Sequence, residues 1–392
     1  MLAALLAIFG STLAPSGCDP PIDLLKATSS ATTSPTGAAT ATSSATTSPT
    51  GAATATSSPA ASLFLCVGAN TSAGNNLFGF LANASTGVLS SGAGSPFSNG
   101  ANPAAAAITP SGAFLYVANS TVNAIAIYSI NASTGALTAA GSIASTGAFP
   151  SGVAIDPTGR FLYEVNQNSN TISSFTINPS TGGLTQTGAI LATGPAPVSV
   201  SVNSTGHFVY VANDFATGSV SAYLINSGGS LTPVSGSPFA AGSNPTSVAA
   251  DPGAGFLYVA NSLSNTITAY TINPTTGALG LINSFGTDAT PEGIAISPSG
   301  DFLYSANNGA SNIDEFTINS STGALSPVGS IAAGAGPVAL TVAQTGSFVY
   351  VANASANSVS GFTINSSTGA LTSIGAATTV GEDPVFVVTA SP

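Results

Sequence analysis

The chain has 392 residues, of which only 4% are charged, and its formal net charge is −11 because thirteen acidic residues oppose only Lys26 and Arg160. Folded domains normally contain about a quarter of charged residues, so Ser, Thr and Asn must solvate this surface. A nucleic-acid partner requires a basic face, and this composition excludes one.

The amino terminus has the pattern of an export signal. Residues 1–17 form an apolar run that ends in small residues just before Cys18. This pattern predicts a signal peptide over residues 1–18 of the bacterial lipoprotein kind, with Cys18 as the lipidated residue. A plain secretory signal or an uncleaved anchor is the alternative. We therefore expect an exported protein that is held to a membrane by its lipid, in the periplasm or at the cell surface, or that is secreted.

Residues 19–61 are dominated by Ser, Thr, Pro and Ala, and the segment ATSSATTSPTGAAT occurs in them twice. They contain too few large apolar residues to offset the entropy of ordering a core. We therefore predict a disordered tether between the signal and the rest of the chain.

From residue 62 to residue 392 the chain repeats one unit. The segment FLYVAN at Phe114–Asn119 returns five times with little change, and the tyrosines from Tyr116 onward are spaced by 47, 47, 48, 46 and 46 residues. The unit that starts at Pro150 predicts an inner strand, a tight turn, a second strand, a third strand over Thr171–Ile177, an S-T-G turn and a fourth strand. Four antiparallel strands in a repeat of this length are typical of one propeller blade.

The strand signatures also predict how the ring closes. A proline followed by small apolar residues marks an inner strand seven times, and the second-strand signature also occurs seven times. The first second strand, at Phe64, follows the tether, whereas the last inner strand, at Pro384, has no second strand after it. We therefore predict an all-β, seven-bladed β-propeller of four-stranded antiparallel blades over residues 62–392, in which the C-terminal strand joins the N-terminal blade. We expect Cys66 to be a small buried hydrophobe and the protein to be a monomer.

These motifs resemble those of a known family. P-x-G-x-F-[LV]-Y-V-A-N, [IV]-S-x-[FY]-x-I-N and S-T-G-x-L are similar to the repeats of the seven-bladed lactonase-like propellers, the 6-phosphogluconolactonase-like family, and of the related YVTN-repeat proteins. The resemblance covers residues 62–392 and implies the same fold. It implies either lactone hydrolysis or a place among exported and cell-surface propellers without assigned chemistry. Lactonases of this family are expected to use His, Arg and Glu side chains, but no His or Arg of this chain matches by position.

Charged residues can be placed by their position in the repeat. The loops that lead into the inner strands, together with the loops between second and third strands, form one face of a propeller, here called the mouth face. The turns between first and second strands form the opposite, far face. His207, the only histidine, and Arg160 fall in far-face turns, where we expect them to be solvated. An acidic mouth face without bases disfavours phosphorylated ligands.

Several residues are candidates for a site on the mouth face. Seven acids fall in or beside its loops: Asp214, Asp288, Glu292, Asp314, Glu315, Glu382 and Asp383. Those near inner-strand starts, and two asparagines that end second strands, are candidate ligand-binding residues: Glu292, Glu382, Asp383, Asn307 and Asn353. Glu292, Glu382 and Asp288 are candidate ligands of a metal, most simply Ca²⁺, which prefers carboxylate and amide oxygens. The alternative is that the acids only solvate loops and the asparagines cap turns.

Glu164 is a candidate catalytic residue because it stands where the other repeats have Val or Ser. Burial would raise the pKa of its carboxyl toward the range of a general base; a solvated position at the rim of the strand is the alternative. The function that we favour from the sequence is a non-catalytic surface module that binds a glycan or a protein at the mouth face. The alternative is a lactone hydrolase that uses a carboxylate or a metal.

Overall fold

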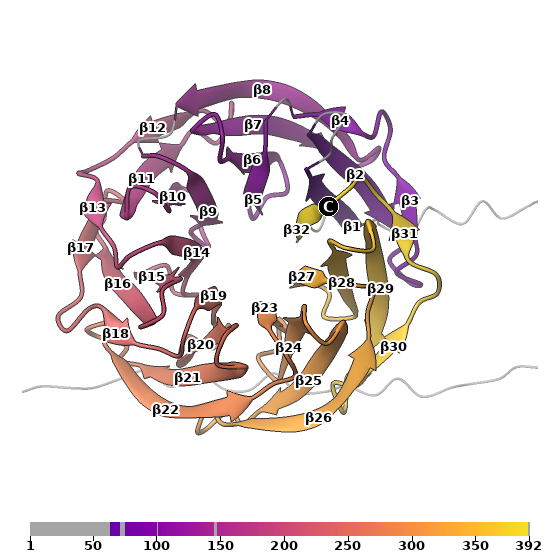
Figure 1. Ribbon diagram of the computed structural model, residues 1–392. Helices are drawn as coiled ribbons and strands as arrows, with labels where there is room; N and C mark the ends of the chain where they lie inside the picture. Colours follow the sequence, from indigo (N-terminus) through magenta and orange to yellow (C-terminus); the bar gives the residue numbers. More distant parts are fainter. Residues whose placement is uncertain (1–62, 71–74, 100, 145–146, 391–392) are drawn as a thin grey trace, which may run out of the picture. The chain divides into compact units, whose positions relative to one another are not determined.

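The computed structural model describes residues 63–70, 75–99, 101–144 and 147–390. Its regular structure is entirely β-strand, in seven antiparallel sheets that surround one axis (Figure 1). The predicted all-β, seven-bladed propeller is therefore confirmed. The predicted signal peptide, Cys18 and the tether lie outside the described residues. Within the described ranges, the structure contains no helix long and apolar enough to cross a membrane.

Each blade begins at the axis with an inner strand, followed by a second strand that is buried along nearly its whole length. The inner strands are β5 (Pro103–Ile108), β9 (Pro150–Ile155), β14 (Pro197–Val202), β19 (Pro245–Ala250), β23 (Pro291–Ile296), β27 (Pro337–Val342) and β32 (Pro384–Ala390). The second strands are β1 (Leu63–Ala69), β6 (Phe114–Asn119), β10 (Phe161–Asn166), β15 (Phe208–Asn213), β20 (Phe256–Asn261), β24 (Phe302–Asn307) and β28 (Phe348–Asn353).

The third and fourth strands form the outer part of each blade. The third strands are β2 (Asn76–Ala82), β7 (Ala124–Asn131), β11 (Thr171–Ile177), β16 (Ser219–Ile225), β21 (Thr266–Ile272), β25 (Asn312–Ile318) and β29 (Ser358–Ile364). Three fourth strands are continuous: β8 (Ala136–Ala144), β22 (Leu279–Gly286) and β26 (Leu325–Ala332). Four are split in two: β3 (Leu89–Ser91) and β4 (Phe97–Ser98), β12 (Leu184–Gln186) and β13 (Leu191–Ala192), β17 (Leu231–Pro233) and β18 (Phe239–Ala240), and β30 (Leu371–Ser373) and β31 (Thr378–Thr379).

The C-terminal strand closes the ring, as the sequence predicts. β32 pairs antiparallel with β1 and places Val387 opposite Val67. Blade 1 therefore consists of β32, β1, β2 and the β3–β4 pair, and blades 2 to 7 follow in chain order. Because the pairing supplies β1 with a neighbour on its axial side, β1 is not an edge strand of its sheet.

The repeated tyrosine and the S-T-G turn hold neighbouring blades together. In six blades the hydroxyl of the second-strand tyrosine donates a hydrogen bond to the carbonyl of the turn glycine in the next blade. These pairs are Tyr116–Gly182, Tyr163–Gly229, Tyr210–Gly277, Tyr258–Gly323, Tyr304–Gly369 and Tyr350–Gly87, at 2.8 to 3.2 Å. The turn glycines have positive φ and pack on the phenylalanine that starts the second strand of the preceding blade. The motifs therefore repeat because they form the interfaces between blades.

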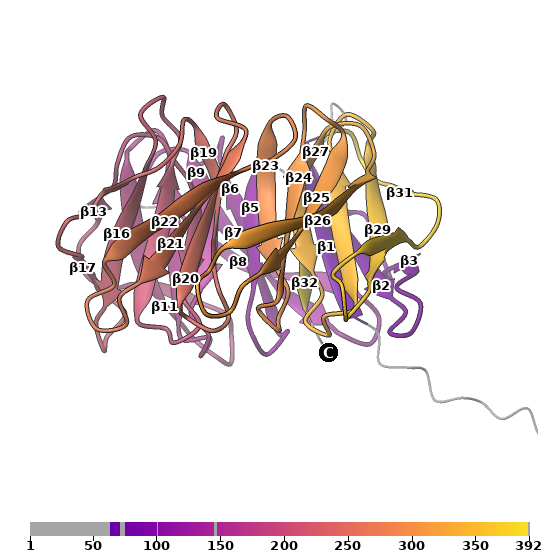
Figure 2. The ribbon, with the colours of Figure 1, turned by 90° about the horizontal axis from the view of Figure 1, so that it is seen from below.

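Blade 1 has Cys66 at the position of the repeated tyrosine. The thiol is fully buried and free, as predicted, and burial raises its pKa. Seen from the side, the connecting loops gather at the two ends of the ring, which are the mouth face and the far face (Figure 2). Any chemistry that needs exposed polar groups therefore belongs to one of these two ends.

Candidate functional site

The basic side chains of the described chain lie on the far face, as predicted. His207 is exposed in the turn between β14 and β15. Arg160 is exposed in the turn between β9 and β10, and its guanidinium lies 4.7 Å from the centre of the Phe161 ring. Asp156 is buried in the same turn and accepts hydrogen bonds from the backbone N–H groups of Arg160 and Phe161. These residues organise turns, and neither base can take part in a site on the mouth face.

Glu292 lies at the axial end of blade 6, where the mouth face begins. In the ladder between β23 and β24, Pro291 pairs with Asn307 and Gly293 pairs with Ala306, so Glu292 is the extra residue of a β-bulge. A bulge redirects the side chain of its unpaired residue and is frequent beside active sites. Glu292 is half-buried. The strand therefore presents this carboxyl separately from the alternating side chains of the blade interior.

The electrostatic environment of Glu292 matches that of a general base. Burial raises the pKa of its carboxyl to about 7, and the negative charge of Asp214 contributes to the increase. A group with a pKa near neutrality exchanges protons readily at physiological pH. Asp214 belongs to blade 4 and Glu292 to blade 6, so this electrostatic interaction acts between two blades that are not neighbours.

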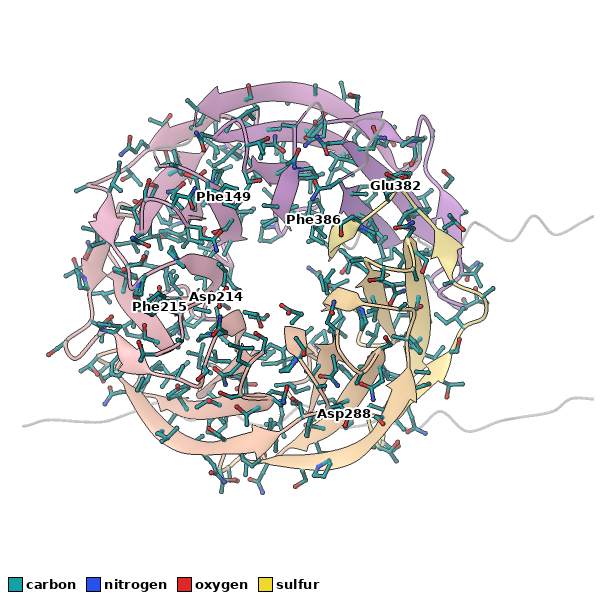
Figure 3. The ribbon with its side chains drawn as sticks, in the orientation of Figure 1. Phe149, Asp214, Phe215, Asp288, Glu382 and Phe386 are labelled. Atoms are coloured by element: carbon teal, nitrogen blue, oxygen red, sulfur yellow. The ribbon has the colours of Figure 1, made fainter. Side chains whose placement is uncertain are left out.

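Asp214 follows the last residue of β15 and is also half-buried. Burial raises the pKa of its carboxyl, and a hydrogen bond with the side chain of Asn244 opposes that increase. The backbone N–H of Asn244 in turn donates to the carbonyl of Phe215, at 3.0 Å. Phe215, the next residue along the chain, is 50% exposed. Figure 3 shows Asp214 on the axial side of its blade.

Asp214 was expected on the mouth face but was not among the predicted site residues. The available signal was its position directly after the repeated V-A-N segment, where other repeats have an uncharged residue. The coupling to Glu292 depends on blades 4 and 6 approaching the same axis, which no local pattern reveals.

The three candidate metal ligands do not lie together. Among the described residues, no three His, Cys, Asp or Glu side chains are grouped so that they could hold a metal ion. Asp288 is exposed in the outer part of the ring, where its carboxylate accepts a hydrogen bond from Asn312. Glu382 is exposed on another blade (Figure 3). A joint Ca²⁺ site of these residues therefore has no support in the geometry, and binding of an ion at any one of them stays a prediction.

The two candidate asparagines are fully buried. The side chain of Asn307 accepts a hydrogen bond from Ser305 and donates one to Asn312. That of Asn353 accepts from the backbone N–H of Gly334 and donates to Ser360. These bonds support the alternative that the asparagines cap local structure. A ligand would have to compete for both groups, so their role in binding stays a prediction.

The surroundings of four further acids are defined by the structure. Asp314 and Glu315 are buried within strand β25. The Asp314 carboxylate accepts the N–H of Asp288 in the neighbouring mouth-face loop, and the Glu315 carboxylate accepts the N–H of Leu371 in blade 7. Glu164 has no exposed surface in β10, so the expectation of a solvated rim position is wrong. Asp383 is exposed, and its N–H donates to the side chain of Asn357 at 3.0 Å. Roles for Glu164 in catalysis and for Asp383 in binding stay predictions.

The chain matches one protein-family model, described as "Lactonase, 7-bladed beta-propeller", over residues 84–202, 193–292 and 283–389. No curated protein sequence matches the chain. Together the matched segments cover residues 84–389, which is most of the propeller that the structure describes.

Solved structures share the fold at low sequence identity. A candidate 6-phosphogluconolactonase from Bacteroides uniformis is 21% identical, with a TM-score of 0.74 over 84% of this chain and 99% of its own. The periplasmic gluconolactonase of Pseudomonas aeruginosa is 17% identical, with a TM-score of 0.72 over 84% and 99%. Hydrazine synthase of Kuenenia stuttgartiensis is 19% identical, with a TM-score of 0.57 over 74% and 92%. The fold therefore accompanies unrelated reactions, and function must be argued from the site.

Proposed function

This chain belongs to the family of seven-bladed β-propeller lactonases, and from that premise we propose that it hydrolyses neutral lactones at the axial end of the mouth face, with Glu292 as general base. The observation that carries the proposal is the β-bulge at the axial end of blade 6, which sets the half-buried carboxyl of Glu292 apart from the blade interior. Burial, together with the charge of Asp214, raises the pKa of this carboxyl to about 7. Lactone hydrolysis, which the sequence offered as the alternative, is therefore favoured over a non-catalytic binding module.

The reaction requires only a carboxyl group that can accept and return a proton. Water loses a proton to the Glu292 carboxylate while its oxygen bonds to the lactone carbonyl carbon. The tetrahedral intermediate then breaks the bond between that carbon and the ring oxygen. The ring oxygen takes the proton back from Glu292 and becomes a hydroxyl, so the product is a hydroxy acid. Asp214 keeps Glu292 basic enough for the first step by disfavouring a second negative charge nearby.

The charge of the mouth face supports a neutral substrate. In the described chain both basic residues, Arg160 and His207, lie on the far face, so no cationic side chain is positioned to bind a phosphate. Of the two activities named for the similar structures, gluconolactonase and 6-phosphogluconolactonase, hydrolysis of the unphosphorylated lactone is the one that this electrostatic field favours. Phe215 offers an apolar surface on which the C–H face of a ring can pack.

We further propose that the protein acts outside the cytoplasm. The apolar run over residues 1–17, followed by Cys18, supports export with lipid attachment to a membrane. The periplasmic location stated for the similar gluconolactonase agrees with export. Globomycin-sensitive processing of the precursor, with loss of acyl labelling in Cys18→Ser, would support attachment at Cys18. An unprocessed cytoplasmic chain would contradict it.

The experiment that tests the reaction is hydrolysis of matched lactones by the full chain. Neutral and 6-phosphorylated forms of the same sugar lactone are compared, and each rate is corrected for spontaneous opening in buffer. We expect faster turnover of the neutral form. Glu292→Gln should lower kcat/KM by about a hundredfold or more, because loss of a positioned base typically has that effect.

The control replaces the exposed acid Asp301 of the far face by Asn, which changes the net charge without touching the mouth face. Asp301→Asn should leave the rate of lactone hydrolysis unchanged, and so should the addition of a chelator. Loss of turnover with chelator would instead favour the metal-assisted mechanism. No turnover on any lactone, with the fold intact, would contradict the proposal and leave the propeller as a binding module for a glycan or a protein.

A further inference from the structure

Thr290, two residues before Glu292, has a backbone conformation that its side chain disfavours. Its φ is 59°, in the left-handed region that a β-branched residue almost never adopts. Such a conformation persists only where the surrounding structure enforces it, and here it belongs to the repeat, because Phe149, Ala196, Asn244 and Asp383 also have positive φ directly before an inner-strand proline. The residue lies in the loop that leads into β23, on the mouth face.

Asn265 of the neighbouring blade holds Thr290 in this conformation. The backbone N–H of Thr290 donates a hydrogen bond to Oδ1 of Asn265, at 2.8 Å. On the other side, the carbonyl of Thr290 accepts the N–H of Asn308, at 2.8 Å. The backbone N–H and carbonyl of Thr290 are therefore both hydrogen-bonded, the N–H to blade 5 and the carbonyl to blade 6.

Thr290 directly precedes the bulge that carries Glu292. The chain passes from Thr290 through Pro291, which has a nearly fixed φ, to the unpaired Glu292. The next residue, Gly293, packs so closely against blade 7 that a Cβ atom there would lie 3.0 Å from the carbonyl oxygen of Val338. The backbone is therefore held on both sides of Glu292, by hydrogen bonds at Thr290 and by close packing at Gly293.

We propose that Asn265 is a positioning residue for Glu292, which it aims at the axis by holding Thr290 in its left-handed conformation. This inference rests on the proposed function for its effect on turnover but not for its effect on the carboxyl itself. The same contact occurs elsewhere in the ring, where Asn123 accepts the N–H of Phe149 at 2.7 Å. Phe149 also has a φ of 59°, but the bulged residue after it is Ser151 and not an acid.

The repeated contact supplies a matched control. In the full chain, Asn265→Ala should lower kcat about tenfold, the effect of one lost hydrogen bond, with little change in KM. Asn123→Ala removes an equivalent bond and should stay within about twofold of the wild type. Thr290→Gly should make Asn265→Ala nearly harmless, because glycine occupies positive φ without steric cost. The comparison with Asn123→Ala separates the two roles, because a merely structural role would make the two asparagine variants lower kcat alike.

A second readout is independent of activity. The side-chain carboxyl carbon of Glu292 is followed by NMR as the pH is varied. In Asn265→Ala the carboxyl should turn toward water, so its titration midpoint should fall, whereas Asn123→Ala should leave it in place. If this shift is seen without any lactone turnover, the positioning role stands and the proposed function fails. An unchanged midpoint in Asn265→Ala, or equal effects of the two variants, would overturn the inference.

Discussion

The hydroxyl of Tyr350 donates a 2.8 Å hydrogen bond to the carbonyl of Gly87, across 263 residues of sequence. It is the same contact that Tyr304 makes with Gly369, also at 2.8 Å, between two blades that are consecutive in the chain. The junction where the C-terminal part of the chain meets the N-terminal part is therefore built like the other junctions. The ring is held closed by strand pairing in blade 1 and by this bond between blades 7 and 1.

Removing the Tyr350 hydroxyl should weaken that junction. Tyr350→Phe leaves the buried carbonyl of Gly87 without its partner and should lower the free energy of unfolding by about 1 to 3 kcal/mol. Urea denaturation of the full chain measures the change, and Tyr304→Phe is the matched variant within the chain-continuous ring. Equal losses are expected; a loss in Tyr304→Phe alone would show that the bond at the closing junction contributes nothing.

Gly229 and the adjacent Gly228 test whether the contact of this turn with Phe161 stabilises the protein, because only Gly229 makes that contact. Gly229 has a φ of 83°, and a Cβ atom there would collide with the ring of Phe161. Gly229→Ala should therefore lower the free energy of unfolding by about 2 kcal/mol or more. A Cβ atom on Gly228 would meet no atom within 4 Å, so Gly228→Ala should have little effect. The same urea experiment checks both, and equal behaviour of the two variants would contradict the interface between blades as described.

The variant Glu164→Gln tests which carboxyl acts in catalysis. Its side chain has no exposed surface, and β10 places it opposite Val153 and Ser173 inside blade 3. A substrate on the mouth face cannot reach it, so kcat of Glu164→Gln should stay close to that of the wild type. A loss comparable to that of Glu292→Gln would restore Glu164 as the general base and displace Glu292.

Much of the fold could be predicted because its determinants are local and repeated. The proline that starts each inner strand, the tyrosine of each second strand and the S-T-G turn recur at a fixed period, and one blade can be read without knowledge of the others. The strand that closes the ring could be predicted by counting strand signatures, since the inner strand that begins at Pro384 has no second strand after it. The contact between Tyr116 and Gly182 explains why both residues recur, but it joins two blades and was not visible in either unit alone.

The candidate site could be predicted only in part, for the same reason. Glu292 was selected because it follows the proline of an inner strand, which places it near the axis in any propeller. Asp214 was not selected, because its importance arises from the approach of blade 4 to blade 6. Asp288 was a candidate ligand with Glu292 because both are acids in or beside mouth-face loops, yet the loop carries Asp288 to the outer part of the ring. The position in the repeat identifies the face of the propeller but not the distance of a loop residue from the axis.

The measurement that tests the central claim most directly is the pH dependence of kcat/KM for a neutral lactone in wild type and Asp214→Asn. Only ionised Glu292 can accept a proton from water, so the wild-type rate should fall as the pH drops through about 7. The charge of Asp214 raises the pKa of Glu292; its removal should therefore move this acidic limb to lower pH, whereas Asp301→Asn on the far face should not move it. A limb that stays in place in Asp214→Asn, or that persists unchanged in Glu292→Gln, would contradict the assignment of Glu292 as the general base.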